Sequence, residues 1–101
     1  MEPEWVKRVK ENLKKVDIKP VFADEVLVMG MVKVRREGEK VSKEGIIRLI
    51  FTDVTTAKPI SVLVITLSTA KGLVKALQNQ INKIEENLGK TTTTTDLTYI
   101  G

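Results

Sequence analysis

The chain has 101 residues and a formal net charge of +4, with 42% hydrophobic, 30% charged and 4% aromatic residues. These values are typical of one globular domain with an aliphatic core, and they exclude a disordered chain. The sequence has no cysteine and no histidine. Disulfides, thiolate metal sites and the commonest general base and metal ligand are therefore excluded. Abundant Lys and Glu without cysteine also give a thermophile-like composition.

Targeting and membrane signals are not expected. The segment Met1–Val16 is charged throughout and lacks the apolar centre of a secretory signal. No apolar stretch approaches the roughly 18 residues that a membrane span requires. The sequence therefore predicts a cytoplasmic protein without membrane contact.

An amphipathic helix is expected over Pro3–Val16. A proline suits a helix start because it gives up an amide that would have no partner there. The helix should end before Pro20. Apolar residues recur at spacings of three and four, at Trp5, Val6, Val9, Leu13 and Val16.

Three strands are expected next, over Val21–Arg36, Val41–Asp53 and Ile60–Leu67. Short turns between them favour an antiparallel meander. We expect Gly45 to mark a bulge or bend. Both faces are apolar, whereas a half-solvated sheet would show polar residues at alternate positions. We expect one face to hold Val26, Val28, Ile46, Ile50, Val62 and Val64, and the other Leu27, Met29, Ile47, Leu49, Leu63 and Ile65.

A second, long helix is expected from an N-cap at Ser68 to Leu88, with Gly89 ending it. Spacings of four and three give a heptad seam at Ala70, Val74, Leu77, Ile81, Ile84 and Leu88. Such a stripe packs either on the chain's own sheet or on a partner. We expect this helix to be the main structural anchor, with Leu77 and Ile81 at its buried centre. We predict a homodimer, joined through an exposed sheet face or through an oligomer interface at Val74, Leu77, Ile81, Ile84 and Leu88.

The expected fold class is therefore α+β, with the order α-β-β-β-α, in one domain over residues 1–90. Residues 91–101 form a Thr-rich C-terminal tail that we expect to be flexible. The alternative is an edge strand whose Tyr99 and Ile100 dock on a sheet or on a partner.

A resemblance covers about Val21–Gly89. The segments Val21–Asp24, Ile47–Phe51 and Pro59–Ser68, then a helix with Ala70-Lys71-Gly72-Leu73 closed by Gly89, follow in the order seen in one family. The chain thereby resembles a family of small bacterial and archaeal proteins catalogued only as a domain of unknown function. It departs from the family at Asp24, where Asn is usual, and at Ile84, where Tyr is common. The resemblance implies the fold and its boundaries, without an activity.

Catalytic and metal-binding residues are not expected. The adjacent carboxylates Asp24-Glu25 and Glu85-Glu86 diverge on a strand and on a helix, so they do not converge on a cation. Ser42 has no histidine to activate it, and a Ser–Lys arrangement with Lys40 or Lys43 would need a desolvated lysine. We therefore expect no enzyme, no metal and no cofactor.

The first hairpin gives the candidate binding site. Basic residues lie along it and could form a ribbon that enters a nucleic-acid groove, at Lys33, Arg35, Arg36, Lys40 and Lys43. Interspersed Glu37, Glu39 and Glu44 weaken the positive field, so a solvated hairpin with ion pairs is the favoured interpretation of these residues, and nucleic-acid binding is the alternative. The chain is predicted to be a small, non-catalytic oligomeric binding protein, and one hypothesis is that it associates with nucleic acid through this hairpin. The other hypothesis is a protein–protein adaptor or regulatory subunit of a larger assembly.

Overall fold

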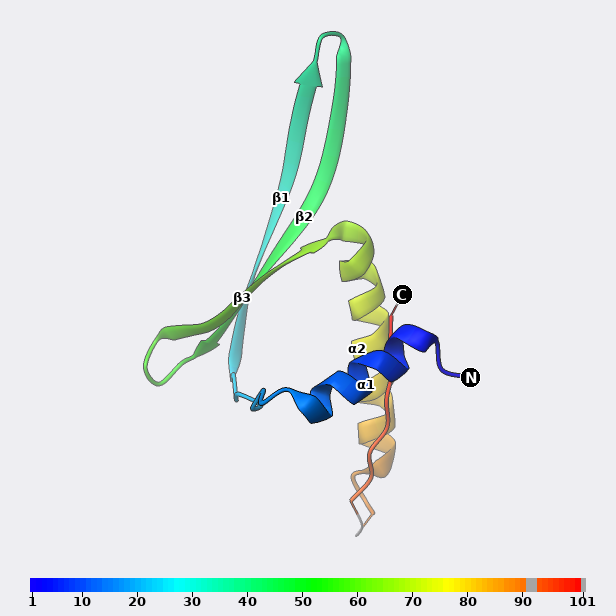
Figure 1. The fold of residues 1–101 in the computed structure, drawn as a ribbon. Coiled ribbons are helices and arrows are strands. Elements are labelled where there is room, and N and C mark those ends of the chain that lie inside the picture. Colours follow the sequence, from blue (N-terminus) through cyan, green and yellow to red (C-terminus); the bar gives the residue numbers. More distant parts are fainter. Residues whose placement is uncertain (91–92, 101) are drawn as a thin grey trace.

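The computed structural model describes residues 1–90 and 93–100. The elements in chain order are the helix α1 (Glu4–Lys15), the strands β1 (Glu25–Glu37), β2 (Lys40–Asp53) and β3 (Lys58–Thr66), and the helix α2 (Leu67–Asn87) (Figure 1). The predicted α+β layout is confirmed. The first strand begins at Glu25 and not at Val21, so the segment before it is a connection from α1.

The three strands form one antiparallel sheet in the order β1-β2-β3. β1 and β2 pair over their whole length, from Glu25 with Thr52 to Glu37 with Lys40. β3 pairs with β2 only from Ile46 onward. Residues 32–45, which we call the arm, therefore extend past β3 as a two-stranded ribbon (Figure 1).

Two local features shape the hairpins. Gly38 has a φ of 60° in the turn at the tip of the arm, a conformation that favours glycine. The expected bulge at Gly45 is not found, and the irregularity lies between Phe51 and Thr52 opposite β3. Its effect is to shift the register of β3 close to the second turn.

The register decides which side chains share a face of the sheet. One face, which we call the aliphatic face, carries Val26, Val28, Val32, Ile47, Leu49, Phe51, Leu63 and Ile65. The other, which we call the arginine face, carries Leu27, Met29, Met31, Ile46, Arg48, Ile50, Val62 and Val64. The expected grouping of Val26 and Val28 with Ile46 and Ile50 is wrong, because Leu27 stands opposite Ile50 and Val28 opposite Leu49.

The helix α2 follows β3 without a loop. Its N-cap is Thr66 and not Ser68, and the Thr66 hydroxyl accepts a hydrogen bond from the backbone N–H of Thr69 at 3.2 Å. A Cβ atom added to Gly45 would lie 3.4 Å from Cβ of Leu67, so the first turn of α2 lies on the aliphatic face. Ala70, one turn further, is buried.

Beyond this first turn α2 diverges from the sheet (Figure 1). The prediction that Leu77 and Ile81 form the buried centre of helix-on-sheet packing within one chain is wrong. Leu77 is 53% exposed and Ile81 is 45% exposed. From Val74 to Leu88 the heptad seam is therefore left exposed by the described residues of its own chain.

Another side of α2 carries the C-terminal segment, residues 93–100. Thr98 accepts hydrogen bonds from the side-chain amides of Asn79 at 2.8 Å and Gln80 at 2.6 Å. Asp96 pairs with Lys83. Ile100 lies against Gly72, where a Cβ atom would approach it to 3.3 Å. Residues 93–100 thus run back along α2. Residues 91, 92 and 101 lie outside the described residues. The flexibility of the tail stays a prediction.

The docking of this segment should respond to pH. A hydrogen bond from Lys83 holds the pKa of Asp96 below its ordinary value of 3.8. The ionised carboxylate of Asp96 therefore stabilises the docked segment at pH values above 3.8. This stabilisation is lost as the pH falls through the lowered pKa of Asp96 and the carboxylate takes up a proton. Trp5 meets Tyr99 edge to face, with ring centroids 6.1 Å apart, so Trp5 fluorescence should report docking. We expect the variant Asp96→Asn at neutral pH to show the same Trp5 fluorescence as the unmodified protein at low pH, where Asp96 is protonated.

The matched control for this prediction is Glu86→Gln, which removes an exposed carboxylate from α2 itself. It should leave the fluorescence and its pH dependence unchanged. If Asp96→Asn behaves like Glu86→Gln, the contact between Asp96 and Lys83 does not hold the segment.

The helix α1 packs on the C-terminal segment and not on the sheet. No Cα atom of α1 lies within 8 Å of a strand. Val6 is buried, but Trp5, Val9, Leu13 and Val16 are 44% to 58% exposed. The N-terminal helix therefore closes neither face of the sheet.

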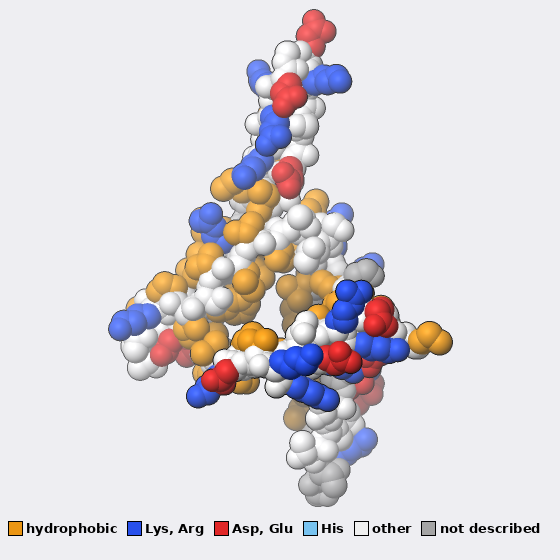
Figure 2. Space-filling model, viewed as in Figure 1, with side chains coloured by type: hydrophobic (Ala, Val, Ile, Leu, Met, Phe, Trp, Pro, Cys, Tyr) orange, Lys and Arg blue, Asp and Glu red, His pale blue; other side chains and the backbone are white. Residues whose placement is uncertain are grey.

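The single chain is unusually open. Its solvent-accessible surface is 9091 Å², whereas a compact monomer of this mass exposes about 5,700 Å². Its radius of gyration is 17.8 Å, against about 13 Å for a compact domain of this length. Hydrophobic side chains gather along the sheet and around the opening between the sheet and the helices (Figure 2). Most of the predicted core is therefore exposed in one chain.

Candidate functional site

The arm places the predicted basic residues on a projecting ribbon. Residues 33–44 carry five cations and three carboxylates, and all of them are exposed. Six residues of each strand extend the arm by about 20 Å beyond the paired sheet. The whole chain measures 62 Å in its longest dimension. The arm is the part of the chain best placed to enter a concave partner.

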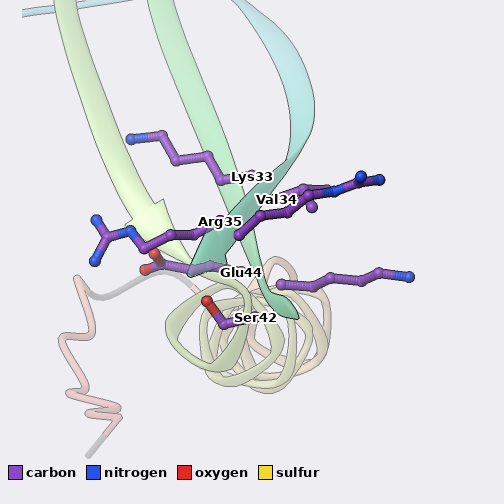
Figure 3. A pocket seen from close by; sticks show the side chains of 7 residues that line it. Lys33, Val34, Arg35, Ser42 and Glu44 are labelled. Carbon is purple, nitrogen blue, oxygen red and sulfur yellow. The ribbon is translucent and has the colours of Figure 1, made fainter. Parts of the chain in front are cut away.

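The pairing divides these cations between the two sides of the ribbon. Lys33 stands opposite Glu44 and Arg35 opposite Ser42. These four side chains extend to one side of the ribbon, as Figure 3 shows, with Val34 on the other. The strand alternation places Lys40 on the side of Lys33 and Arg35.

The opposite side of the ribbon has a different charge pattern. Arg36 stands opposite Val41, and Val34 stands opposite Lys43. Arg36 and Lys43 are thus diagonal neighbours, and no carboxylate of the paired residues 32–37 and 40–45 shares their side. The carboxylates Glu37 and Glu44 lie with Lys33 and Arg35. The side of Arg36 and Lys43 therefore carries the less interrupted positive charge.

The cations of the arm are free to meet an external anion. The described residues contain two ion pairs, Lys10 with Glu2 and Lys83 with Asp96, and neither lies in the arm. The ion pairs expected within a solvated hairpin are therefore not formed. A hollow of about 570 Å³ follows the ribbon, lined by Lys33, Val34, Arg35, Arg36, Ser42, Lys43 and Glu44 (Figure 3).

The predicted oligomer interface is a second exposed surface. Along α2 the residues that we call the stripe are exposed by between 45% and 74%, and they are Val74, Leu77, Ile81, Ile84 and Leu88. Within this stripe there is no charged side chain. The described residues leave these five aliphatic side chains exposed side by side along the helix, and so much apolar surface in water is unfavourable.

Other candidates do not converge on a site. The carboxylate of Asp24 accepts a hydrogen bond from the backbone N–H of Val54 at 2.9 Å and so fixes the second turn. Among the described residues no three acidic side chains come together as metal ligands. The same residues contain no helix that is long and apolar enough to cross a membrane.

One exposed charge of the sheet was not predicted as part of a site. Arg48 lies at the centre of the arginine face, between Met29 and Val64, and it is exposed. It makes no ion pair with any described residue. A charged residue in the middle of an apolar strand is visible in the sequence, but only the register shows which of the two faces it interrupts.

Comparison of the chain with protein families, with curated proteins and with solved structures found no match. The resemblance to a family of small bacterial and archaeal proteins accordingly stays a prediction. The arm, the stripe and the two faces of the sheet are the features of the chain that bear on its function.

Proposed function

We propose that this chain is a non-catalytic binding protein that acts as a homodimer and presents its arm to nucleic acid. The observation that carries the proposal is the projecting ribbon with five cations, none of which forms an ion pair with a carboxylate of the described residues. A two-stranded ribbon fits the major groove of duplex DNA, which is about 12 Å wide.

The homodimer is supported by the surface of the single chain. The accessible area of 9091 Å² exceeds that of a compact monomer by about 3,400 Å². Standard interfaces bury about 800 Å² per partner, and obligate homodimers bury more. One second copy of the chain can bury this surplus surface, because a two-fold dimer buries the same surfaces on both copies.

A non-catalytic role is supported by the chemistry of the chain. Histidine and cysteine are absent from the sequence. Ser42 lies on the exposed arm, and Lys40 and Lys43 are exposed as well, whereas a Ser–Lys catalytic pair needs a desolvated lysine. The arm is thus suited to electrostatic binding and not to proton transfer.

The test is binding to a short DNA duplex and to a single-stranded oligonucleotide over a range of salt concentrations. Replacing Arg35 and Arg36 together with Gln should weaken duplex binding roughly tenfold or more at about 0.1 M salt. Each lost phosphate contact removes about 0.9 from the salt slope, so the double variant should lower the slope by about 2. Sequence preference should not change, because phosphate contacts carry no base information.

A matched control is the double variant Glu37→Gln, Glu39→Gln. It neutralises two negative charges near the same turn and keeps the size of both side chains, so it should strengthen binding to the DNA duplex. Equal affinities for the wild type and the Arg variant would refute nucleic-acid binding by the arm. The protein–protein adaptor would then be the better account, with the arm as a protein-binding surface.

A further inference from the structure

The stripe and the part of the aliphatic face beyond the first turn of α2 are not covered by the described residues of the chain, and they are similar in length. The stripe runs from Val74 to Leu88, which is about 21 Å along a helix. The aliphatic face runs from Val26 to Val32 along β1, which is about 20 Å. Three strands are about 10 Å across between the outer two, close to the diameter of one helix with its side chains. One α2 helix therefore covers one aliphatic face.

The chain does not make this contact with itself. Thr66 is the last residue of β3 and the N-cap of α2, so no loop lets the helix fold back along the sheet. The first turn of α2 lies against Gly45, and the stripe beyond it stays exposed. Val28 and Val32 on the aliphatic face remain 63% and 68% exposed.

Charge distinguishes the aliphatic face from the arginine face as a partner for the stripe. A helix laid on the arginine face would bury Arg48, and no residue of the stripe has a carboxylate to pair with it. An uncompensated buried charge costs several kcal/mol. On the aliphatic face the three-strand region from Val26 to Gly30 has Ser61 as its one polar side chain.

We propose that the homodimer forms by reciprocal exchange, with the stripe of each chain on the aliphatic face of the other. This inference rests on the homodimer proposed above and adds the surfaces that join it. Reciprocity gives two equivalent helix-on-sheet contacts and a closed two-fold assembly. Two contacts also fit the surplus of about 3,400 Å² per chain better than a single patch does, because one standard patch covers about 800 Å². The arginine face and the part of the arm beyond Val32 stay on the outside.

The natural chain has no cysteine, so introduced cysteines report contacts without background. The test variant is Leu63→Cys/Ile81→Cys, which places one thiol on the aliphatic face and one on the stripe. Its matched control is Val64→Cys/Ile81→Cys, because Val64 is the next residue and points to the arginine face. Both positions on β3 are similarly exposed, at 49% for Leu63 and 58% for Val64. A short bifunctional maleimide tolerates an offset in register.

We expect the Leu63/Ile81 variant to become a covalent dimer and the Val64/Ile81 variant to stay largely unlinked. Each single-cysteine variant should also stay unlinked. Linkage within one chain would mean that α2 folds back on its own sheet, and linkage of Ile81→Cys alone would mean helix-to-helix pairing. Either result overturns the exchange. Dimers by sedimentation without the expected linkage also refute the exchange and leave the homodimer standing, whereas single chains by sedimentation refute both.

Discussion

Replacing Leu77 with Lys should separate the homodimer into single chains and leave those chains largely unfolded. In one chain Leu77 is 53% exposed, so a lysine there would disturb little. In the proposed dimer the same position lies at the centre of a helix-on-sheet contact. An ammonium group without a partner in an apolar contact costs several kcal/mol. A domain of this size has a free energy of unfolding of about 5–15 kcal/mol in total, so a loss of several kcal/mol is enough to dissociate the dimer and unfold most of the chains.

The gentler variant Leu77→Ala measures the same burial without introducing a charge. It should lower the free energy of unfolding of the assembled protein by about 2–5 kcal/mol, the usual cost of truncating a buried leucine. Light scattering gives the mass of each variant, and far-ultraviolet circular dichroism with urea gives its stability. The linear dependence on urea then yields the free energy of unfolding.

The matched control is Gln78→Lys, the neighbouring position of α2 and outside the stripe. Gln78 is exposed, and its side-chain amide donates to Asn82 at 2.9 Å. The change adds the same charge to the same turn, so it should cost about 0.5 kcal/mol or less. If Leu77→Lys keeps the mass and stability of Gln78→Lys, the stripe is not buried in any assembly.

The sequence predicted the elements well because their signals are local. Trp5, Val9 and Leu13 follow the helical period, and the turn at Gly38 separates two apolar runs, so the helix and the hairpin could be placed without knowledge of the tertiary contacts. Strand ends were predicted to within a few residues, with the largest error at Glu25. The basic residues of the arm were also found, because their position near a turn implies exposure.

The packing could not be predicted in the same way. An apolar stripe shows which side of α2 avoids water, but not whether its own sheet or a second chain covers it. Register was equally ambiguous, because both faces of the strands are apolar and a slip by one residue costs no obvious burial. Arg48 makes the two faces of the sheet different. The face of β1 that it shares is known only from the register, in which Met29 stands opposite Arg48.

The C-terminal segment shows a third limit. Its contacts are polar and join residues far apart in sequence, such as Thr98 with Asn79 and Asp96 with Lys83. No periodic sequence pattern predicts these contacts, because each is made by a single pair of side chains. The aromatic pair of Trp5 with Tyr99 likewise joins the two ends of the chain.

The central claim is that one chain cannot bury its own apolar surface and that a second copy completes it. The decisive measurement is sedimentation equilibrium of the unmodified protein at micromolar concentration, combined with urea unfolding at several protein concentrations. A homodimer predicts twice the 11.3 kDa of one chain and an unfolding midpoint that rises with protein concentration. A stably folded species of 11.3 kDa whose midpoint does not depend on concentration would contradict the claim.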